Sequence, residues 1–182
     1  HLLTMAITIN GSGTIAGISA GGLPLGAGGK FAQVVHVAKK DTFSTTASDG
    51  VFATVFSAQI TPSSTSSKIL VMWNSEVSTA SDGQRMAFRM LRGSTAVNVA
   101  DASGNKTRSD IGNLNSKNGA SIHPASATFL DSPSTTSQLT YNLQVGAETG
   151  GNTLFVNKAA GEVDSDSYYR STSNIVLIEV AA

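Results

Sequence analysis

QLTYNLQV, residues 138–145, alternates polar and apolar side chains without a break. Successive side chains of a β-strand point to opposite faces of a sheet, so this alternation predicts a strand with one buried and one polar face. The side chains predicted to be buried are Leu139, Tyr141, Leu143 and Val145. The fold must therefore supply a core on one side of this strand and solvent or polar neighbours on the other.

Similar strand signals occur upstream of this segment. Residues 85–92 alternate large apolar side chains with arginine and alanine, as expected for a second half-buried strand. An earlier strand is predicted to place four apolar side chains on one face: Phe52, Phe56, Ala58 and Ile60. These segments predict a core made by the inward faces of several strands.

Two segments are apolar on both faces. Residues 69–73 read ILVMW, and residues 175–180 read IVLIEV. A strand of this kind is covered on both sides. One face can pack inside a sandwich and the other needs a partner, which a symmetric homo-oligomer supplies.

The whole set of signals predicts an all-β fold. No window of 11 or more residues has a convincing helical period. Eight or nine short strands separated by turn residues are typical of an antiparallel β-sandwich of jelly-roll type. We expect the first and last strands to lie centrally, because both are rich in apolar residues. The strand segments are residues 31–37, 52–60, 68–77, 85–92, 96–99, 122–130, 138–145, 154–156 and 175–180.

The composition changes near residue 30. Before it, isolated isoleucines are separated by glycine and serine, a pattern that cannot build a core of its own. We therefore predict that residues 1–29 form an extended glycine-rich connector or attachment segment. Residues 30–182 are then one sandwich domain.

Charge and cysteine content exclude several classes of function. Lys+Arg and Asp+Glu both count 12, so bulk charge favours neither nucleic acid nor an anionic membrane as a partner. No apolar run reaches the roughly 18–20 residues of a membrane span, so we expect no membrane insertion. The absence of cysteine removes disulfides and every cysteine-ligated metal site.

Motifs that carry chemistry are weak in this chain. Residues 17–21 match the G-x-S-x-G nucleophile elbow but lie in the glycine-rich connector, without the strand and helix that the elbow needs. His36 and His123 have no ligand-like neighbours in the sequence. We therefore expect no catalytic residue, no metal site and no cofactor, and we predict that the protein is not an enzyme.

Two polar loops are candidates for binding. Tyr168, Tyr169 and Arg170 lie in a loop that joins the last two strands, and exposed aromatics beside hydrogen-bonding groups commonly hold a sugar ring or a protein hot spot. The alternative is that the tyrosines cap the end of the sandwich or pack at a subunit interface. The second loop, predicted over residues 101–120, carries the candidates Asn113 and Lys117 and is longer than a turn requires.

Several strings of turn and strand residues, taken together, resemble the carboxy-terminal region of bacteriophage tail-fibre and minor structural proteins. The string INGSGTIAGISAGGLP resembles the connector before the terminal domain in that family, and later strings follow in the family's order. The matching strings occupy residues 9–24, 60–71, 91–95, 130–136 and 171–180.

This resemblance implies a homotrimeric virion protein whose terminal domain attaches to a host-surface glycan or protein. It also implies contacts with other virion proteins through the N-terminal segment. The attachment domain and long shaft of such fibres are absent from this sequence, so a fragment and a short fibre mounted on the capsid are both consistent with it.

Three functions remain as hypotheses: a host-binding adhesin, a purely structural head fibre or capsid decoration protein, and a glycan-degrading spike. The spike has the least support, because the glutamates are well separated along the chain and form no recognisable pair.

Overall fold

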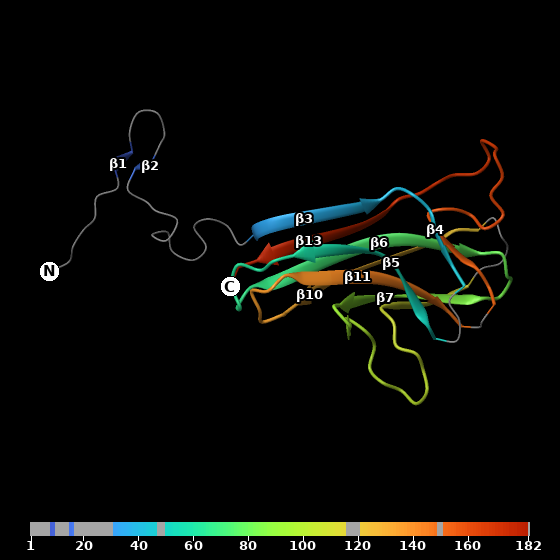
Figure 1. Ribbon diagram of the computed structural model, residues 1–182, viewed down its shortest axis with the longest axis horizontal. Coiled ribbons are helices and arrows are strands. Elements are labelled where there is room, and N and C mark those ends of the chain that lie inside the picture. Colours follow the sequence, from blue (N-terminus) through green and yellow to red (C-terminus); the bar gives the residue numbers. More distant parts are fainter. Residues whose placement is uncertain are drawn as a thin grey trace.

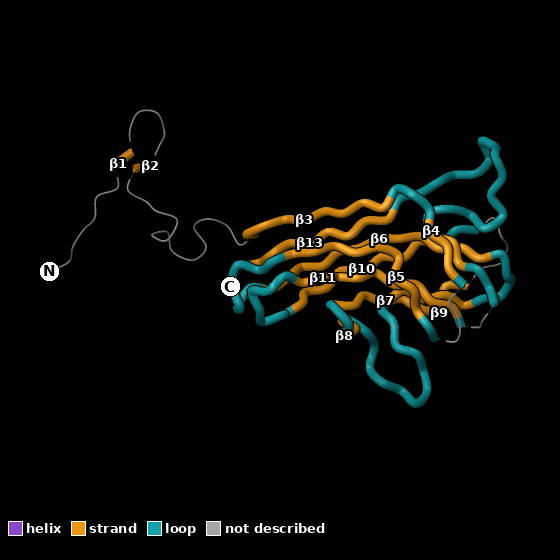
Figure 2. Tube along the Cα trace, in the orientation of Figure 1, coloured by secondary structure: helices purple, strands orange, loops and turns teal. Residues whose placement is uncertain are grey.

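The computed structural model describes residues 8–9, 15–16, 31–46, 50–115, 121–148 and 151–181. Within these ranges every regular element is a β-strand (Figure 2), and no helix is long and apolar enough to cross a membrane. The strands are β1 Thr8–Ile9, β2 Ile15–Ala16, β3 Phe31–Lys39, β4 Phe43–Thr45, β5 Phe52–Ile60, β6 Lys68–Thr79, β7 Arg85–Arg92, β8 Thr95–Val97, β9 Ile111–Asn115, β10 His123–Asp131, β11 Leu139–Ala147, β12 Leu154–Val156 and β13 Ser173–Val180.

The first sheet is built around β6. This long strand pairs with β10 along one edge, and along the other edge it pairs first with β13 and then with β12. The two short strands β4 and β12 pair with each other, and β3 pairs with β13. The six strands therefore occupy four positions across the sheet: β10, β6, β13 with β12, and β3 with β4.

The second sheet has the order β5, β11, β7, and then β8 and β9 along the remaining edge of β7. All pairings in both sheets are antiparallel. From β4 to β7, and again from β9 to β12, successive strands of the chain alternate between the two sheets, as Figure 1 shows for β5, β6 and β7. Four positions in each sheet with this alternation make a jelly roll, as the sequence predicted.

The expected positions of the first and last sandwich strands are half right. Strand β13 lies between β3 and β6, at the centre of the first sheet, as predicted. Strand β3 pairs only with β13 and lies at the edge, so the prediction for it is wrong. Its outward side chains Val34 and His36 are exposed, which an edge position permits.

The core lies between the sheets and follows the predicted alternation. Tyr141, Leu143 and Val145 of β11 are fully buried. From the opposite sheet Trp73 packs against Phe88, with ring centroids 5.4 Å apart. This contact joins the centres of β6 and β7.

A buried polar contact also joins the sheets, at the end of the sandwich where β13 finishes. Asp131 of β10 accepts a hydrogen bond from the Tyr141 hydroxyl at 2.6 Å and pairs with Arg92 of β7 at 2.6 Å. Because all three side chains are largely shielded from solvent, the pair is screened less than a surface ion pair. The contact fixes the position of β10 relative to the second sheet.

Glu179 forms a second polar contact at the same end. Its carboxylate is fully buried and accepts hydrogen bonds from the Ser63 backbone at 2.7 Å, the Ser63 hydroxyl at 2.6 Å and the Gln33 amide at 2.7 Å. Burial by itself raises the pKa of Glu179, but the hydrogen bonds from Ser63 and Gln33 outweigh it and lower the pKa to about 2. The carboxylate therefore ties β3 and the β5–β6 turn to β13.

Replacing Glu179 with glutamine is expected to lower the free energy of unfolding at pH 7 by about 1–3 kcal/mol. The new amide NH₂ faces the Gln33 NH₂, so a donor meets a donor. Because the folded-state pKa is depressed, the contribution of the carboxylate is complete above the ordinary glutamate pKa of 4.5 and is lost as pH falls towards about 2. Urea unfolding of both proteins from pH 7 to pH 2, at one protein concentration, checks this. A difference in stability that stays constant over the range contradicts it.

Candidate functional site

Two of the longer connections lie at one end of the sandwich. In Figure 1 the chain enters β3 and leaves β13 at one end, and the β6–β7 and β12–β13 connections lie at the other. The strand pairing agrees with this view. Val180, the last residue of β13, lies opposite Phe31, the first residue of β3. In the second sheet, Gly146 and Phe52 form the last pair of the β5–β11 ladder, at the end away from Leu139 and Ile60. We call the far end the loop end.

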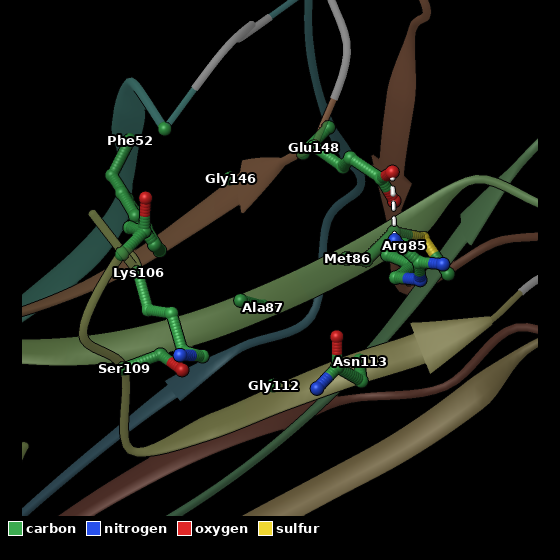
Figure 3. A pocket seen from close by; sticks show the side chains of 13 residues that line it. Phe52, Arg85, Met86, Ala87, Lys106, Ser109, Gly112, Asn113, Gly146 and Glu148 are labelled. Carbon is green, nitrogen blue, oxygen red and sulfur yellow. Dashed lines mark hydrogen bonds and ion pairs between the residues drawn. The ribbon is translucent and has the colours of Figure 1, made fainter. Parts of the chain in front are cut away.

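A cleft of about 540 Å³ lies at the loop end on the second sheet (Figure 3). Phe52 of β5, Gly146 of β11 and Ala87 of β7 contribute its apolar lining. Lys106 and Ser109 reach it from the loop that precedes β9. Apolar surface with a few converging polar groups is the usual character of a ligand site, and the volume is within the usual range of about 300–1,000 Å³.

A β-bulge orients Phe52 towards this cleft. The pairing of β11 with β5 shifts register between Leu143 and Gln144, so Val55 has no partner opposite it. Phe56, Ala58 and Ile60 remain on the core side, whereas Phe52 lines the cleft. The prediction that all four share one face is therefore wrong for Phe52, because one extra residue reverses the side on which the strand's earlier side chains lie.

Glycine at position 146 makes room for the Phe52 ring. A Cβ atom there would lie 3.0 Å from two ring carbons and 3.0 Å from the Val51 carbonyl oxygen. Arg89 lies over the same ring, with its guanidinium carbon 4.1 Å from the centroid. The ring is thus fixed in position by contacts that need no side chain at residue 146.

The charged groups of the cleft are two cations and one carboxylate. Arg85 and Glu148 form an ion pair at 2.8 Å, and both side chains are roughly half exposed. Lys106 donates a hydrogen bond to the Ser103 hydroxyl at 3.3 Å, and it has no carboxylate partner among the described residues. Exposed pairs of this kind contribute little to stability, so these groups are free to exchange partners with a ligand.

Asn113 lies in the cleft, on the short strand β9. The predicted loop over residues 101–120 is therefore wrong in part, because residues 111–115 pair with β7. Asn113 has a φ of 57°, in the left-handed region that asparagine tolerates better than most residues. Lys117 lies outside the described residues, so its predicted role stays a prediction.

The tyrosine loop joins β12 and β13, as predicted. Tyr169 is 79% exposed and Tyr168 is half-buried. Arg170 forms hydrogen bonds through its Nε to both carboxylate oxygens of Glu162, at 3.0 and 3.1 Å. Arg170 thus has a carboxylate partner within its own loop, and Tyr169 is the exposed aromatic that the loop offers.

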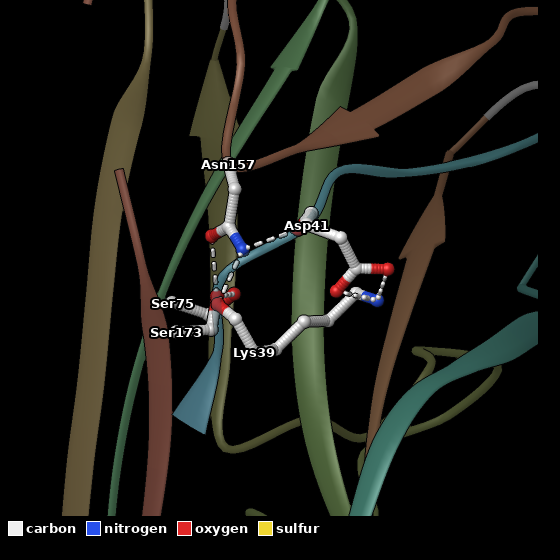
Figure 4. Close-up of polar contacts among 5 residues, drawn as sticks. All are labelled: Lys39, Asp41, Ser75, Asn157 and Ser173. Carbon is white, nitrogen blue, oxygen red and sulfur yellow. Dashed lines mark hydrogen bonds and ion pairs between the residues drawn. The ribbon is translucent and has the colours of Figure 1, made fainter. Parts of the chain in front are cut away.

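A buried asparagine anchors the base of this loop (Figure 4). The Asn157 amide donates to the backbone carbonyls of Lys39 at 2.9 Å and Asp41 at 3.0 Å, and its oxygen accepts from the Ser173 hydroxyl at 2.7 Å. The Ser173 hydroxyl is also 2.8 Å from that of Ser75. The loop therefore begins and ends at one satisfied polar cluster on β6, β13 and the β3–β4 turn.

Asp110 is a partly buried carboxyl at the foot of the loop that walls the cleft. Its backbone N–H donates to the Phe88 carbonyl at 3.0 Å. Within the described part of the chain, neither carboxyl oxygen forms a hydrogen bond of normal geometry, and neither does the Trp73 indole nitrogen. Burial raises the pKa of Asp110 to about 7, although the Met90 backbone and the Trp73 side chain act in the opposite direction.

The elevated pKa of Asp110 makes stability fall as pH rises. Between the ordinary pKa of 3.8 and about 7 the folded state keeps the proton while the unfolded chain loses it, so stability falls as pH rises through that interval. Asp110→Asn, which removes the charge and keeps the shape, is expected to raise the free energy of unfolding at pH 8 by about 1–3 kcal/mol and to leave it unchanged near pH 4. Urea unfolding from pH 4 to pH 8 tests this. Equal pH dependence in the two proteins would show that Asp110 is not responsible.

The described residues of the cleft show no arrangement typical of catalysis. Across the described ranges, no group of three or more His, Asp or Glu side chains could hold a metal ion. Among the described residues that line the cleft, Glu148 is the only carboxylate, and it pairs with Arg85; glycoside hydrolysis uses two carboxylates. Its groups are suited to hydrogen bonding and stacking.

No protein-family profile and no curated protein matches the chain. Among solved structures, the chain is similar to the VP2 subviral particle of infectious bursal disease virus, with a TM-score of 0.45 and 15% identity over 82% of this chain and 37% of that one. It is also similar to the structure of the Gt strain of that virus, with a TM-score of 0.46 and 16% identity over 82% of this chain and 38% of the other. The chain spans less than two fifths of these viral proteins, and a likeness at this level identifies neither a family nor a function.

Proposed function

We propose that this chain is a structural domain of a virus particle, namely the terminal domain of a fibre that attaches the particle to a host-surface glycan or protein. In this proposal residues 1–29 connect the domain to other virion proteins, and the copies assemble as a homotrimer. The cleft at the loop end binds the host molecule. The protein carries out no reaction, and nucleic acid is not a partner.

The observation that carries this proposal is the separation of two ends. The chain enters the sandwich through β3, and the tyrosine loop lies at the opposite end (Figure 1). The cleft lies at that same end, because Phe52 and Gly146, which line it, are at the end of the β5–β11 ladder far from Ile60 and Leu139. A domain tethered through its N-terminus thus presents these loops away from the particle. Jelly rolls are also common among viral capsid and lectin domains, and the resemblance to tail-fibre termini supports the same role.

The chemistry of the cleft favours a saccharide as the host molecule. Phe52 offers an aromatic surface, and Asn113, Ser109 and Lys106 offer side-chain donors and acceptors around it. Sugar rings combine an apolar face with a fringe of hydroxyls, so they need this combination of groups. The cation Lys106, which pairs with no carboxylate in the described part of the chain, also suits a sugar that carries a negative charge.

A purely structural role, as a head fibre or capsid decoration protein, is the second candidate. Phe31, Val34 and Leu130 on the first sheet are 65%, 61% and 51% exposed. Exposed apolar surface of this kind typically marks a contact with another protein. In this alternative the particle contacts carry the function, and changes in the cleft have no effect.

The attachment proposal predicts that Asn113→Gly combined with Lys106→Ser lowers binding to host cells by at least about tenfold, a loss of about 1.4 kcal/mol. Glycine keeps the positive φ at residue 113 and removes the amide. Binding of fluorescently labelled protein to host cells, before and after enzymatic removal of surface glycans, provides the measurement.

Asn98→Gly is the matched control, because Asn98 also has a positive φ, of 55°, but does not line the cleft. This variant is expected to bind like the wild type. Tyr169→Ser tests the other loop separately. Full binding by both the cleft variant and the Tyr169 variant would reject attachment through the loop end and favour the structural role.

A further inference from the structure

The outer face of the first sheet carries apolar side chains in register across its strands. Leu130 of β10, Leu70 of β6, Ile178 of β13 and Val34 of β3 are direct cross-strand neighbours and form one row. Their flanking residues on β6 and β13, including Ile69, are buried on the opposite, core side. Alternation therefore places all four side chains of the row on the outside.

Two further rows lie beside this one. Met72 pairs with Val176, which pairs with His36, and Val180 pairs with both Lys68 and Phe31. We call the three rows together the outer apolar face. Only Lys68 and His36 among its residues are titratable, and the face contains no acidic side chain.

The outer face of the second sheet is polar, unlike the outer apolar face of the first sheet. Its cross-strand neighbours form hydrogen bonds with one another: Gln59 with Thr140 at 3.1 Å, Gln144 with Thr54 at 3.0 Å, and Arg89 with Gln144 at 2.9 Å. These polar pairs satisfy that face in water without a partner. The contrast shows that an apolar exterior is not a general property of this sandwich.

The area of the outer apolar face is comparable to the apolar central part of a protein–protein interface. The central row is apolar at all four strand positions, whereas Thr128 is the β10 neighbour of Met72 and the outermost row does not reach β10. The three rows therefore cover at most roughly 15 Å by 15 Å in flat projection, from strand spacings of about 4.8 Å and a rise of about 3.3 Å per residue. Because the side chains project from the sheet, the accessible area of the face is larger than this projection. It approaches the area of the largest apolar patches on monomeric proteins, which is about 300–600 Å². A stable interface needs about 800 Å² on each partner, so polar neighbours such as Asn74 and Asn174 would form its rim.

The charges on this face favour another copy of the chain as its partner over a membrane surface or a strongly charged protein. Three copies of the face can converge around a shared axis without burying an acidic group, and Lys68 and His36, in rows at the two sides of the central row, can remain near solvent. A membrane surface would require a basic rim, and the face has one lysine. A strongly charged protein would find no complementary group.

We propose that copies of this chain assemble through the outer apolar face, with the row through Leu70 and Ile178 at the centre of the contact. This inference rests on the proposed homo-oligomer and assigns it a surface. It leaves the cleft on the second sheet open in the assembly, because the two sheets present opposite outer faces. Assembly and ligand binding then use different sides of one sandwich.

Light scattering on the full chain tests the assignment. The wild type is expected at three times the chain mass of 18.6 kDa, and Leu70→Thr combined with Ile178→Thr at the mass of one chain. Threonine retains strand preference while removing apolar area. Leu91→Thr, on the outer face of the second sheet opposite Asn142, is the matched control and is expected to keep the wild-type mass.

Each contrary result has a distinct meaning. A monomeric wild type overturns both the homo-oligomer and its interface. An oligomeric double variant with wild-type mass overturns only the interface and leaves the homo-oligomer intact. Circular dichroism and cooperative unfolding of the double variant establish that a loss of mass is not a loss of fold.

A cysteine experiment covers the case in which the double variant fails to fold. The chain has no cysteine, so His36→Cys introduces one thiol on the outer apolar face and Gln59→Cys introduces one on the polar face. A short bismaleimide is expected to link chains covalently through residue 36 and not through residue 59. A residue-36 thiol that is protected from maleimide in a monomeric protein would show that residues 1–30 cover the face instead, and it would overturn the proposal.

Discussion

Strand β6 forms hydrogen bonds along both of its edges over the same residues, with β13 on one side and β10 on the other. Because side chains alternate with period two, this double pairing fixes which apolar residues enter the core and which remain outside. Val71 and Trp73 face the second sheet, and Leu70 and Met72 face away from it. The core, the outer apolar face and the position of the edge strand β3 all depend on this one register.

Much of this arrangement could be predicted from the sequence. The alternation around Tyr141 predicts its burial, and the apolar runs that contain Leu70 and Ile178 predict a sheet with two apolar faces. Both signals are local, since they need only the period of a strand. The jelly-roll order follows less directly, from the number and spacing of short strands.

The cleft could be predicted only in part, for physical reasons. Asn113 and Lys106 stand in a long polar segment that the sequence marks as a possible site, but nothing local shows that Phe52 joins them. The bulge opposite Gln144 reverses the side of Phe52, and a bulge is a property of two paired strands. Gly146 is the available signal, because glycine inside an alternating strand often marks a close approach of another group.

The edge position of β3 also has a mechanical consequence. Tension applied between Phe31 and the loop end acts along the axis of β3, and the hydrogen bonds to β13 run perpendicular to that axis. The load therefore falls on the whole β3–β13 ladder at once, in shear, instead of opening its bonds one after another. The Glu179 carboxylate, which ties Gln33 and Ser63 to β13 at the pulled end, shares the load. In the proposed attachment role, a pull on the particle would act along a strong direction of this domain.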